Sequence, residues 1–98
     1  MPDKRYTYSK RAERDLIDIY LTTAKEWGSA QADKYDAGLE KTVKLLTDSP
    51  TLGRNIDHIK VGCHRFEYER HIIFYRKRET DILIIRILHD RMDVERHL

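Results

Sequence analysis

Six side chains in the second half of the chain are of types that bind phosphate or exchange protons near neutral pH. They are Arg65, His71, Arg86, His89, Arg91 and His97. Arginine can hold phosphate oxygens through parallel hydrogen bonds, and histidine changes its charge between roughly pH 5 and pH 8. Cleavage of an RNA backbone needs both properties, so residual nuclease chemistry is one hypothesis for this set. The structural alternative is that Arg86 and Arg91 pair with Asp90 or Asp93, or bond to backbone carbonyls.

Cysteine and histidine give little support for a metal site or a thiol nucleophile. Cys63 and His64, with His58, His71 and His97, lack the paired and closely spaced ligands of structural zinc. His64 follows Cys63 directly on a predicted strand, so the two side chains should point to opposite faces of a sheet. His64 is then badly placed to activate the thiol. We expect no metal, no cofactor and no catalytic residue, with Cys63 as a small apolar filler.

The composition indicates a well-solvated protein of one domain, residues 1–98. Charged residues make up 37% of the chain, yet the net charge is only +2. Acidic and basic side chains are therefore interspersed, and charge alone identifies no nucleic-acid partner. The single cysteine excludes an intramolecular disulfide, and no run approaches the roughly 18 apolar residues of a membrane span. We expect a cytoplasmic protein without membrane contact.

The first half of the chain is predicted to form a short strand and two helices. Residues 6–8 are aromatic and β-branched, which favours a strand, and Ser9 is placed to cap the following helix. Gly28 is predicted to end that helix, and Ser29 to cap the second one, which ends before Pro50. Apolar residues recur at helical spacing, first at Ala12, Leu16, Ile19, Tyr20, Thr23 and Trp27, then at Ala32, Tyr35, Leu39, Val43 and Leu46. So short a link between two helices predicts an antiparallel hairpin.

The second half is predicted to form a sheet. Residues 52–62 carry turn-forming residues without periodicity and should form a loop. Three β-rich runs follow, at residues 63–68, 71–77 and 82–89, with a polar turn at residues 78–81. The last run is apolar on both faces except at Arg86, as in a central strand with both faces sheltered. Residues 94–98 should form one helical turn. The order predicts an α+β fold, β-α-α-β-β-β, with a helical hairpin on a four-stranded, mostly antiparallel sheet.

Four segments of the sequence resemble the ParE branch of the ParE/RelE toxin superfamily, over nearly the whole chain. They are the first helix with Ala12, Asp15-Leu16 and Ile19; Glu26-Trp27-Gly28 with Ala32 and Tyr35; Ser49-Pro50-Thr51-Leu52-Gly53-Arg54; and His71-Ile72-Ile73-Phe74-Tyr75-Arg76 with Ile85-Arg86-Ile87-Leu88-His89-Asp90-Arg91-Met92-Asp93. We interpret Trp27 as a buried anchor of the corner between the helices, because so large an aromatic contributes much buried area wherever it packs.

The resemblance implies the toxin of a type II toxin–antitoxin system, which binds DNA gyrase and causes growth arrest. In that branch the toxin is not a catalyst, and such pairs are associated with plasmid stabilisation. A ParD-like antitoxin is the implied partner, with a toxin homodimer or a heterotetramer as possible assemblies and with DNA contacted only through the antitoxin or gyrase. The alternative is a ribosome-dependent mRNA interferase of the RelE type. In that branch an arginine follows the aromatic of the third strand, where this chain has Ile72. A third hypothesis is a protein-binding module that has lost toxicity.

Two sets of residues are assigned to partners on this basis. The candidates for contact with the target are Arg86, His89, Arg91 and Asp93, which follow a rigid apolar strand. The candidates for contact with the antitoxin are Tyr20, Trp27 and Tyr35, on the helical hairpin. We also expect that residues 92–98 could be removed without harm to the fold.

Overall fold

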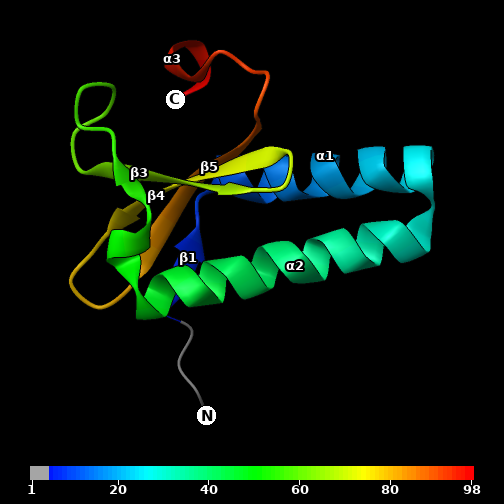
Figure 1. The fold of residues 1–98 in the computed structure, drawn as a ribbon, viewed down its shortest axis with the longest axis horizontal. Helices are drawn as coiled ribbons and strands as arrows, with labels where there is room; N and C mark the ends of the chain where they lie inside the picture. The colour runs from blue at the N-terminus through cyan, green and yellow to red at the C-terminus, as the bar shows by residue number, and fades with distance from the viewer. Residues whose placement is uncertain (1–4) are drawn as a thin grey trace.

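Two long helices and a mixed sheet form the part of the chain that this computed structural model describes, residues 5–98 (Figure 1). The elements in order are β1 (Tyr6–Tyr8), α1 (Lys10–Trp27), α2 (Ser29–Asp48), a 3-10 turn η1 (Pro50–Leu52), β2 (Arg54–Asn55), β3 (Cys63–Tyr68), β4 (His71–Lys77), β5 (Ile82–His89) and α3 (Val94–His97). The class is α+β, as predicted. The limits of β3, β4 and β5 agree with the three predicted runs.

The sheet has the order β1-β5-β4-β3-β2, with β1 parallel to β5 and the other pairs antiparallel. The predicted strand count of four is therefore wrong by one. The additional strand is β2, which lies in the predicted loop and pairs Arg54 with Arg65 and Asn55 with His64. Two residues are too few to produce a periodic pattern, so only the pairing with β3 reveals this strand. The central position of β5, between β1 and β4, is confirmed.

Local signals explain where the helices begin and end. The Ser9 side chain accepts a hydrogen bond from the Ala12 N–H at 3.0 Å, which caps α1 as predicted. Gly28 has φ +93°, a value that side chains with a Cβ rarely adopt, and it separates the two helices. The predicted cap at Ser29 is wrong, because Ser29 is the first residue of α2 and no side chain caps that helix.

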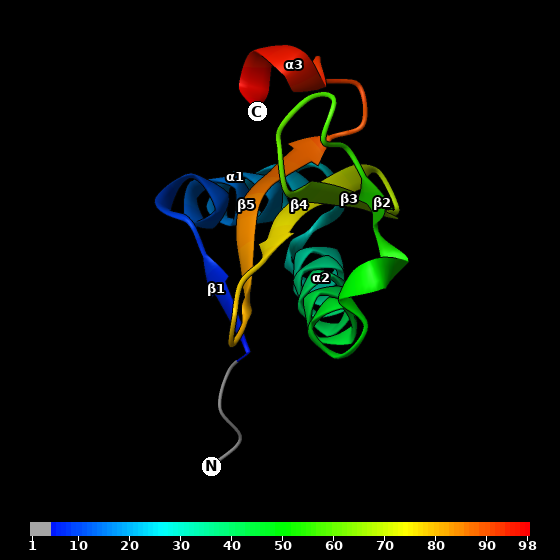
Figure 2. The same cartoon turned by 90° about the vertical axis from the view of Figure 1, so that its left-hand side faces the viewer.

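Two apolar layers lie on opposite faces of the sheet. The helical hairpin covers one face, where Ile19, Leu39 and Val43 pack with Ile73 and Ile84 of the sheet. Phe74, Ile72 and Leu88 occupy the other face, beneath Ile56 and Ile59 of the β2–β3 loop and Val94 and Leu98 of the C-terminal segment. Figure 2 shows this loop and α3 together on the side of the sheet away from α2. No helix in residues 5–98 has both the length and the apolar character needed to cross a membrane.

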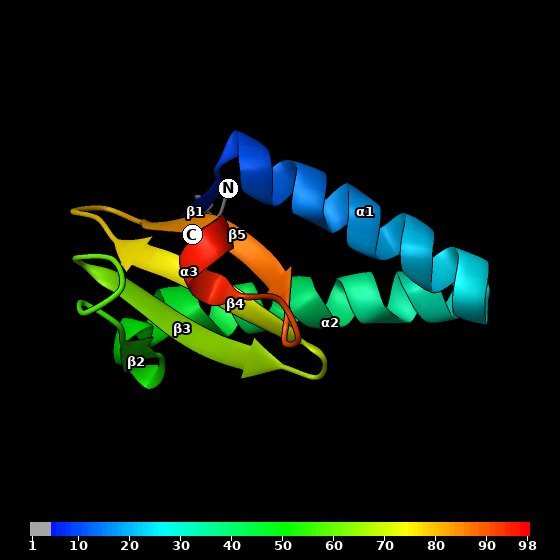
Figure 3. The ribbon, with the colours of Figure 1, turned by 90° about the horizontal axis from the view of Figure 1, so that it is seen from above.

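The hairpin is longer than the sheet beneath it. Seen from above, α1 and α2 converge on their connection well beyond the ends of the strands (Figure 3). The β3–β4 turn and the end of β5 therefore lie beside the overhanging part of the helices. A surface groove lies between them.

Candidate functional site: a groove between the helical hairpin and the sheet

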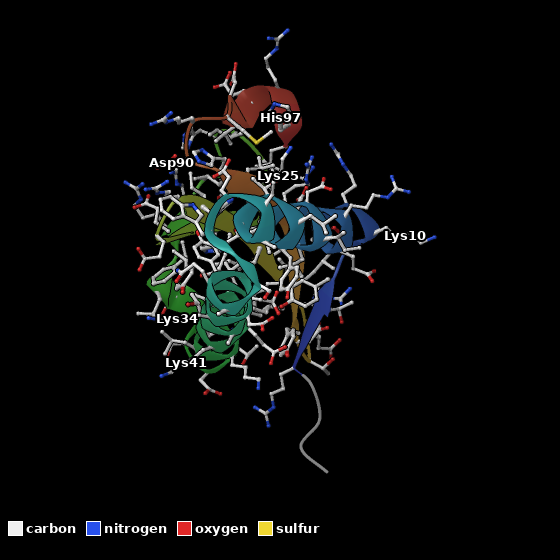
Figure 4. All side chains as sticks on the ribbon, turned by 90° about the vertical axis from the view of Figure 1, so that its right-hand side faces the viewer. Lys10, Lys25, Lys34, Lys41, Asp90 and His97 are labelled. Atoms are coloured by element: carbon white, nitrogen blue, oxygen red, sulfur yellow. The ribbon has the colours of Figure 1, made fainter. Side chains whose placement is uncertain are left out.

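The groove has a volume of about 920 Å³ and is open to solvent. One wall is the side of α1, with Asp18, Glu26 and Trp27, and the opposite wall is the β3–β4 turn. Tyr35 from α2 and His89 at the end of β5 also line it. Figure 4, which views the hairpin end-on, shows Lys34 of α2 and Asp90 after β5 on the same side of the molecule, away from Lys10.

The groove brings together residues from both predicted sets. Trp27 and Tyr35 were assigned to the antitoxin and His89 to the target, and all three line this one groove. Tyr20 lies apart from them, in a shallow apolar hollow on another side of α1 with Ile17 and Leu21. Its hydroxyl donates a hydrogen bond to Asp33 Oδ1 at 2.6 Å. The helices therefore carry two separate surfaces.

Trp27 is not a buried anchor, so that interpretation is wrong. Its side chain is 64% exposed, at the mouth of the groove. The helices meet beyond the sheet, where there is no core to receive an indole, and the turn depends on the positive φ of Gly28 instead. Helical spacing assigns Trp27 to the apolar face of α1, but it does not reveal that this face extends beyond the sheet.

A short row of contacting side chains crosses the groove from α2 to β5. The Tyr35 hydroxyl and His71 Nδ1 form a hydrogen bond of 2.6 Å, and the ring of His71 meets the ring of His89 edge-on with centroids 5.3 Å apart. His89 Nδ1 accepts from the Arg91 N–H at 3.1 Å and lies 3.0 Å from Asp90 Oδ1. The contact with Arg91 requires a neutral His89, and an ion pair with Asp90 requires a protonated one.

Burial controls the protonation of His71. It lowers the pKa of this imidazole to about 4, and the neighbouring His89 acts in the same direction, while Asp90 and Asp15 oppose the shift. The ring is consequently neutral near pH 7. A neutral His71 carries no positive charge, so it cannot hold a phosphate as a cation.

Arg86 forms a nearly buried ion pair with Asp15 of α1. Nε and Nη2 donate to the two carboxylate oxygens at 2.8 and 2.9 Å, and the side chains are only 11% and 13% exposed. For Arg86, the alternative of an ion pair with Asp90 or Asp93 is therefore wrong. Hydrogen bonding to Asp15 raises the pKa of Arg86 further, so the guanidinium is permanently charged. Its Nη1 donates to the His97 carbonyl at 2.9 Å, which confirms the alternative of a bond to a backbone carbonyl.

Asp15 also completes the edge of the sheet. β1 pairs with β5 only as far as Ile84, and beyond that point α1 takes the place of a strand. The Ile87 N–H, which would otherwise have no partner there, donates to Asp15 Oδ2 at 2.9 Å. The sequence signal for this site was the lone arginine in an apolar strand. Nothing in the spacing indicated that its partner lies 71 residues earlier.

The residues after β5 differ in their availability. Arg91 is exposed and forms no ion pair with another described residue, whereas Asp93 accepts from the Glu95 N–H at 3.1 Å and caps α3. The expectation that residues 92–98 are dispensable for the fold is contradicted, because Val94 and Leu98 cover apolar residues of the sheet and the His97 carbonyl binds Arg86.

The six phosphate-binding or titratable side chains do not converge on one centre. His71 and His89 share the groove, while Arg65 lies over the ring of Phe74 on the opposite face and pairs with Glu67. Ile72 is buried on that opposite face as well.

The orientation predicted for Cys63 and His64 is confirmed. Cys63 is fully buried in the layer beneath the β2–β3 loop, and burial raises the pKa of its thiol. His64 stacks on Tyr75 in the other layer, with ring centroids 5.5 Å apart. The thiol therefore has no base beside it.

Comparison with known proteins identifies the family. A family model described as the ParE toxin of the type II toxin–antitoxin system parDE matches residues 6–94. The chain belongs to the ParE toxin family. The match includes both helices of the hairpin and every strand of the sheet, so the groove of this ParE-family toxin lies entirely within the matched region.

Individual relatives agree with this result. Toxin ParE1 of Caulobacter vibrioides is 34% identical over 95 residues, which covers 97% of this chain and 98% of the relative. Toxin ParE1 of Mycobacterium tuberculosis is 36% identical over 95 residues, with 96% and 97% covered. The solved structure of a chromosomal ParDE toxin–antitoxin system from P. aeruginosa superimposes with a TM-score of 0.74 at 22% identity, covering 88% of this chain and 95% of that one, which supports the fold.

Proposed function

We propose that this ParE-family toxin acts in the cytoplasm by binding DNA gyrase, and that it stalls the enzyme on cleaved DNA without being a catalyst itself. Membership of the ParE family carries the proposal. The segment after β5 supports it, because Arg91 is exposed in the turn that directly follows β5, while Arg86 holds that strand against α1. A contact surface held in this way can bind a partner with little loss of conformational entropy.

Within this proposal, His89, Arg91 and Asp93 contribute to the target-binding surface and Arg86 positions them. Arg86 is too deeply buried to offer its guanidinium to a partner, since Asp15 and the His97 carbonyl occupy three of its donors. Its contribution is to fix the end of β5 and the start of the segment that follows. Replacement of Arg86 should therefore reduce toxicity through the fold, and replacement of Arg91 through contact.

The antitoxin neutralises the toxin by covering the groove. Trp27 and Tyr35 lie on its walls together with His89, so a segment bound there would also mask part of the target-binding surface. Tyr20 belongs to the second apolar surface of α1, and an antitoxin segment that wraps around this helix would reach both the groove and that surface. Neutralisation by such masking needs no change in the conformation of the toxin.

The second candidate function is cleavage of ribosome-bound messenger RNA. It is favoured by one feature, the pair formed by His71 and His89, because two adjacent imidazoles can act as base and acid. Three features oppose it: a neutral His71 offers no positive charge to a phosphate, Arg86 is held by Asp15 and the His97 carbonyl, and Ile72 is buried where the RelE branch has an arginine. Arg70 lines the groove with the two histidines, and Arg91 contacts His89 through its backbone N–H.

Induction of the toxin alone in growing bacteria separates these functions. A gyrase inhibitor should stop DNA synthesis first and induce DNA-damage signalling, while protein synthesis continues at the start. An mRNA interferase should stop protein synthesis first, without damage signalling. The wild-type chain should be compared with Arg91→Ala at equal protein levels. If the variant arrests growth as strongly as the wild type, Arg91 does not belong to the target-binding surface.

A further inference from the structure

The two walls of the groove carry different charges. On the α1 wall, Asp18 and Glu26 are exposed, and neither forms an ion pair with another residue in the described range 5–98. Asp15 in the same wall is already neutralised by Arg86. The two free carboxylates are eight positions apart on the helix, a distance of about 12 Å along the axis. The wall therefore presents two carboxylates that form no ion pair within this range.

The rest of the groove does not supply the missing cations. Lys34 on α2 and Arg70 in the β3–β4 turn stand opposite, with Glu69 beside Arg70 and with a neutral His71. None of these side chains bridges to α1. A bound partner would thus meet a negative wall on one side and a weakly positive one on the other.

Apolar and aromatic surface lies between these charged walls. Ile19, Ile87 and Leu88 contribute to the lining, and Tyr35 rises from α2. Trp27 follows Glu26 at the mouth of the groove with most of its indole exposed. A guanidinium or ammonium group held here would gain from the ring face and from the carboxylate together.

We infer that the groove binds an amphipathic segment of the antitoxin whose flank facing α1 carries arginine or lysine and whose central stripe is apolar. One of the cationic side chains contacts Trp27 and Glu26, and another contacts Asp18. The inference rests on the proposed function for the identity of the occupant, and adds the charge and the orientation of that occupant. The opposite polarity, with an acidic flank toward α1, would place like charges in contact.

The test measures antitoxin affinity for a toxin with both carboxylates reversed, Asp18→Lys and Glu26→Lys. The matched control reverses Glu13→Lys and Glu79→Lys, two exposed acidic residues outside the groove, so that both variants change net charge equally. The groove variant should bind the antitoxin about 10- to 100-fold more weakly at low salt, and the difference from the control should shrink as salt screens the contact. Trp27→Ala should also weaken binding, whatever the salt.

The outcomes separate this inference from the proposed function. If the groove and control variants bind the antitoxin equally well, or if the groove variant binds more tightly, the inference of a cationic flank is wrong. If Trp27→Ala still weakens binding in that case, the antitoxin occupies the groove through other contacts and the proposed masking stands. If no groove variant changes affinity, the masking fails too. Circular dichroism and urea unfolding of each variant, expected to match the wild type, confirm that exposed substitutions leave the fold intact.

Discussion

Arg86 and Asp15 show how one residue pair joins the first helix to the last strand. Taken alone, either charge would be costly in a position that is nearly buried. Together they form two parallel hydrogen bonds, and Asp15 additionally receives the Ile87 N–H at the open edge of β5. The pair thereby fixes the end of β5, where His89 lies and from which the turn with Arg91 continues.

Removal of one partner should therefore destabilise the fold strongly. Asp15→Asn leaves the guanidinium without its counter-ion, and Arg86→Met leaves the carboxylate without one; each should lower the free energy of unfolding by about 3 kcal/mol. The double variant Asp15→Asn with Arg86→Met should lose less than the sum of the two, because no unpaired charge remains. Urea unfolding measures all of these, and losses under about 0.5 kcal/mol would mean that the pair behaves as a surface contact.

His71 should make stability depend on pH. The folded state keeps the ring neutral down to about pH 4, whereas the unfolded chain binds a proton near the ordinary value of 6.5. Between these values the unfolded state holds more protons, so stability is full above pH 6.5 and falls as the pH drops through this window. The ring is partly exposed and solvent screens its charge. We therefore expect the free energy of unfolding to fall by about 1 kcal/mol, which is less than the full pKa shift would give.

The variant His71→Gln isolates this contribution, because an amide can still form a hydrogen bond with Tyr35 and does not titrate. Unfolding free energies measured between pH 7 and pH 4 should fall more steeply for the wild type than for the variant. Parallel curves would show that His71 titrates alike in the folded and unfolded states.

Sequence alone predicted part of the chemistry at this scale. The isolated arginine in an apolar strand marked Arg86 as unusual, and alternation along a strand placed Cys63 and His64 on opposite faces. Asp15 was not identified as the partner, since ion pairing over 71 residues depends on how the hairpin meets the sheet. The neutrality of His71 also depends on tertiary burial, which no local pattern reports.

At the scale of elements, one tyrosine fastens the 3-10 turn to the sheet. The buried Tyr75 hydroxyl donates to the Pro50 carbonyl at 2.7 Å and accepts from the Gly53 N–H at 2.9 Å. A Cβ on Gly53 would lie 2.3 Å from that hydroxyl oxygen. The chain therefore needs glycine here for close approach, and not for an unusual φ.

Gly53→Ala should cost about 1–3 kcal/mol, because Tyr75 is fully buried and cannot move aside without disturbing the core. Thr51→Ala, on the exposed side of the same turn, is the control and should change stability by less than about 0.5 kcal/mol. Thermal or urea unfolding compares the two. Equal stability of both variants would show that the turn is only loosely attached to the sheet.

Leu39 and Leu45 of α2 test the orientation of the hairpin on the sheet. Leu39 is buried against strands, and Leu45 is about half exposed. Leu39→Ala should reduce the free energy of unfolding by about 2–5 kcal/mol through the cavity that it leaves, and Leu45→Ala by clearly less. A larger loss at Leu45 would require a different rotation of α2.

The elements themselves were the most predictable part of the fold. Both helices, the three long strands and the turn after Asp93 follow from apolar periodicity and from local caps such as Ser9. The short strand β2 was missed because it exists only through pairing. Trp27 was misplaced because periodicity describes the face of a helix and not how far the sheet extends beneath it.

At the scale of the whole molecule, the overhang of the hairpin brings the predicted antitoxin surface next to the predicted target surface. Residues assigned separately to antitoxin and target meet in one groove, because the helices extend beyond the sheet on the side where β5 ends. The C-terminal segment closes the opposite face of the sheet, so its removal is a test of folding rather than of toxicity. Substitution of exposed residues is the cleaner approach.

The most direct test of the proposed function incubates the purified toxin with DNA gyrase and plasmid and measures cleaved DNA. Wild-type toxin should make gyrase accumulate cleaved plasmid, Arg91→Ala should lose this effect while retaining the wild-type unfolding curve, and added antitoxin should abolish it. Translating ribosomes with the same toxin should keep their messenger RNA uncut. Unaltered gyrase activity together with site-specific cleavage of that RNA, lost in His89→Ala or Arg91→Ala, would contradict the proposal and establish the ribonuclease alternative.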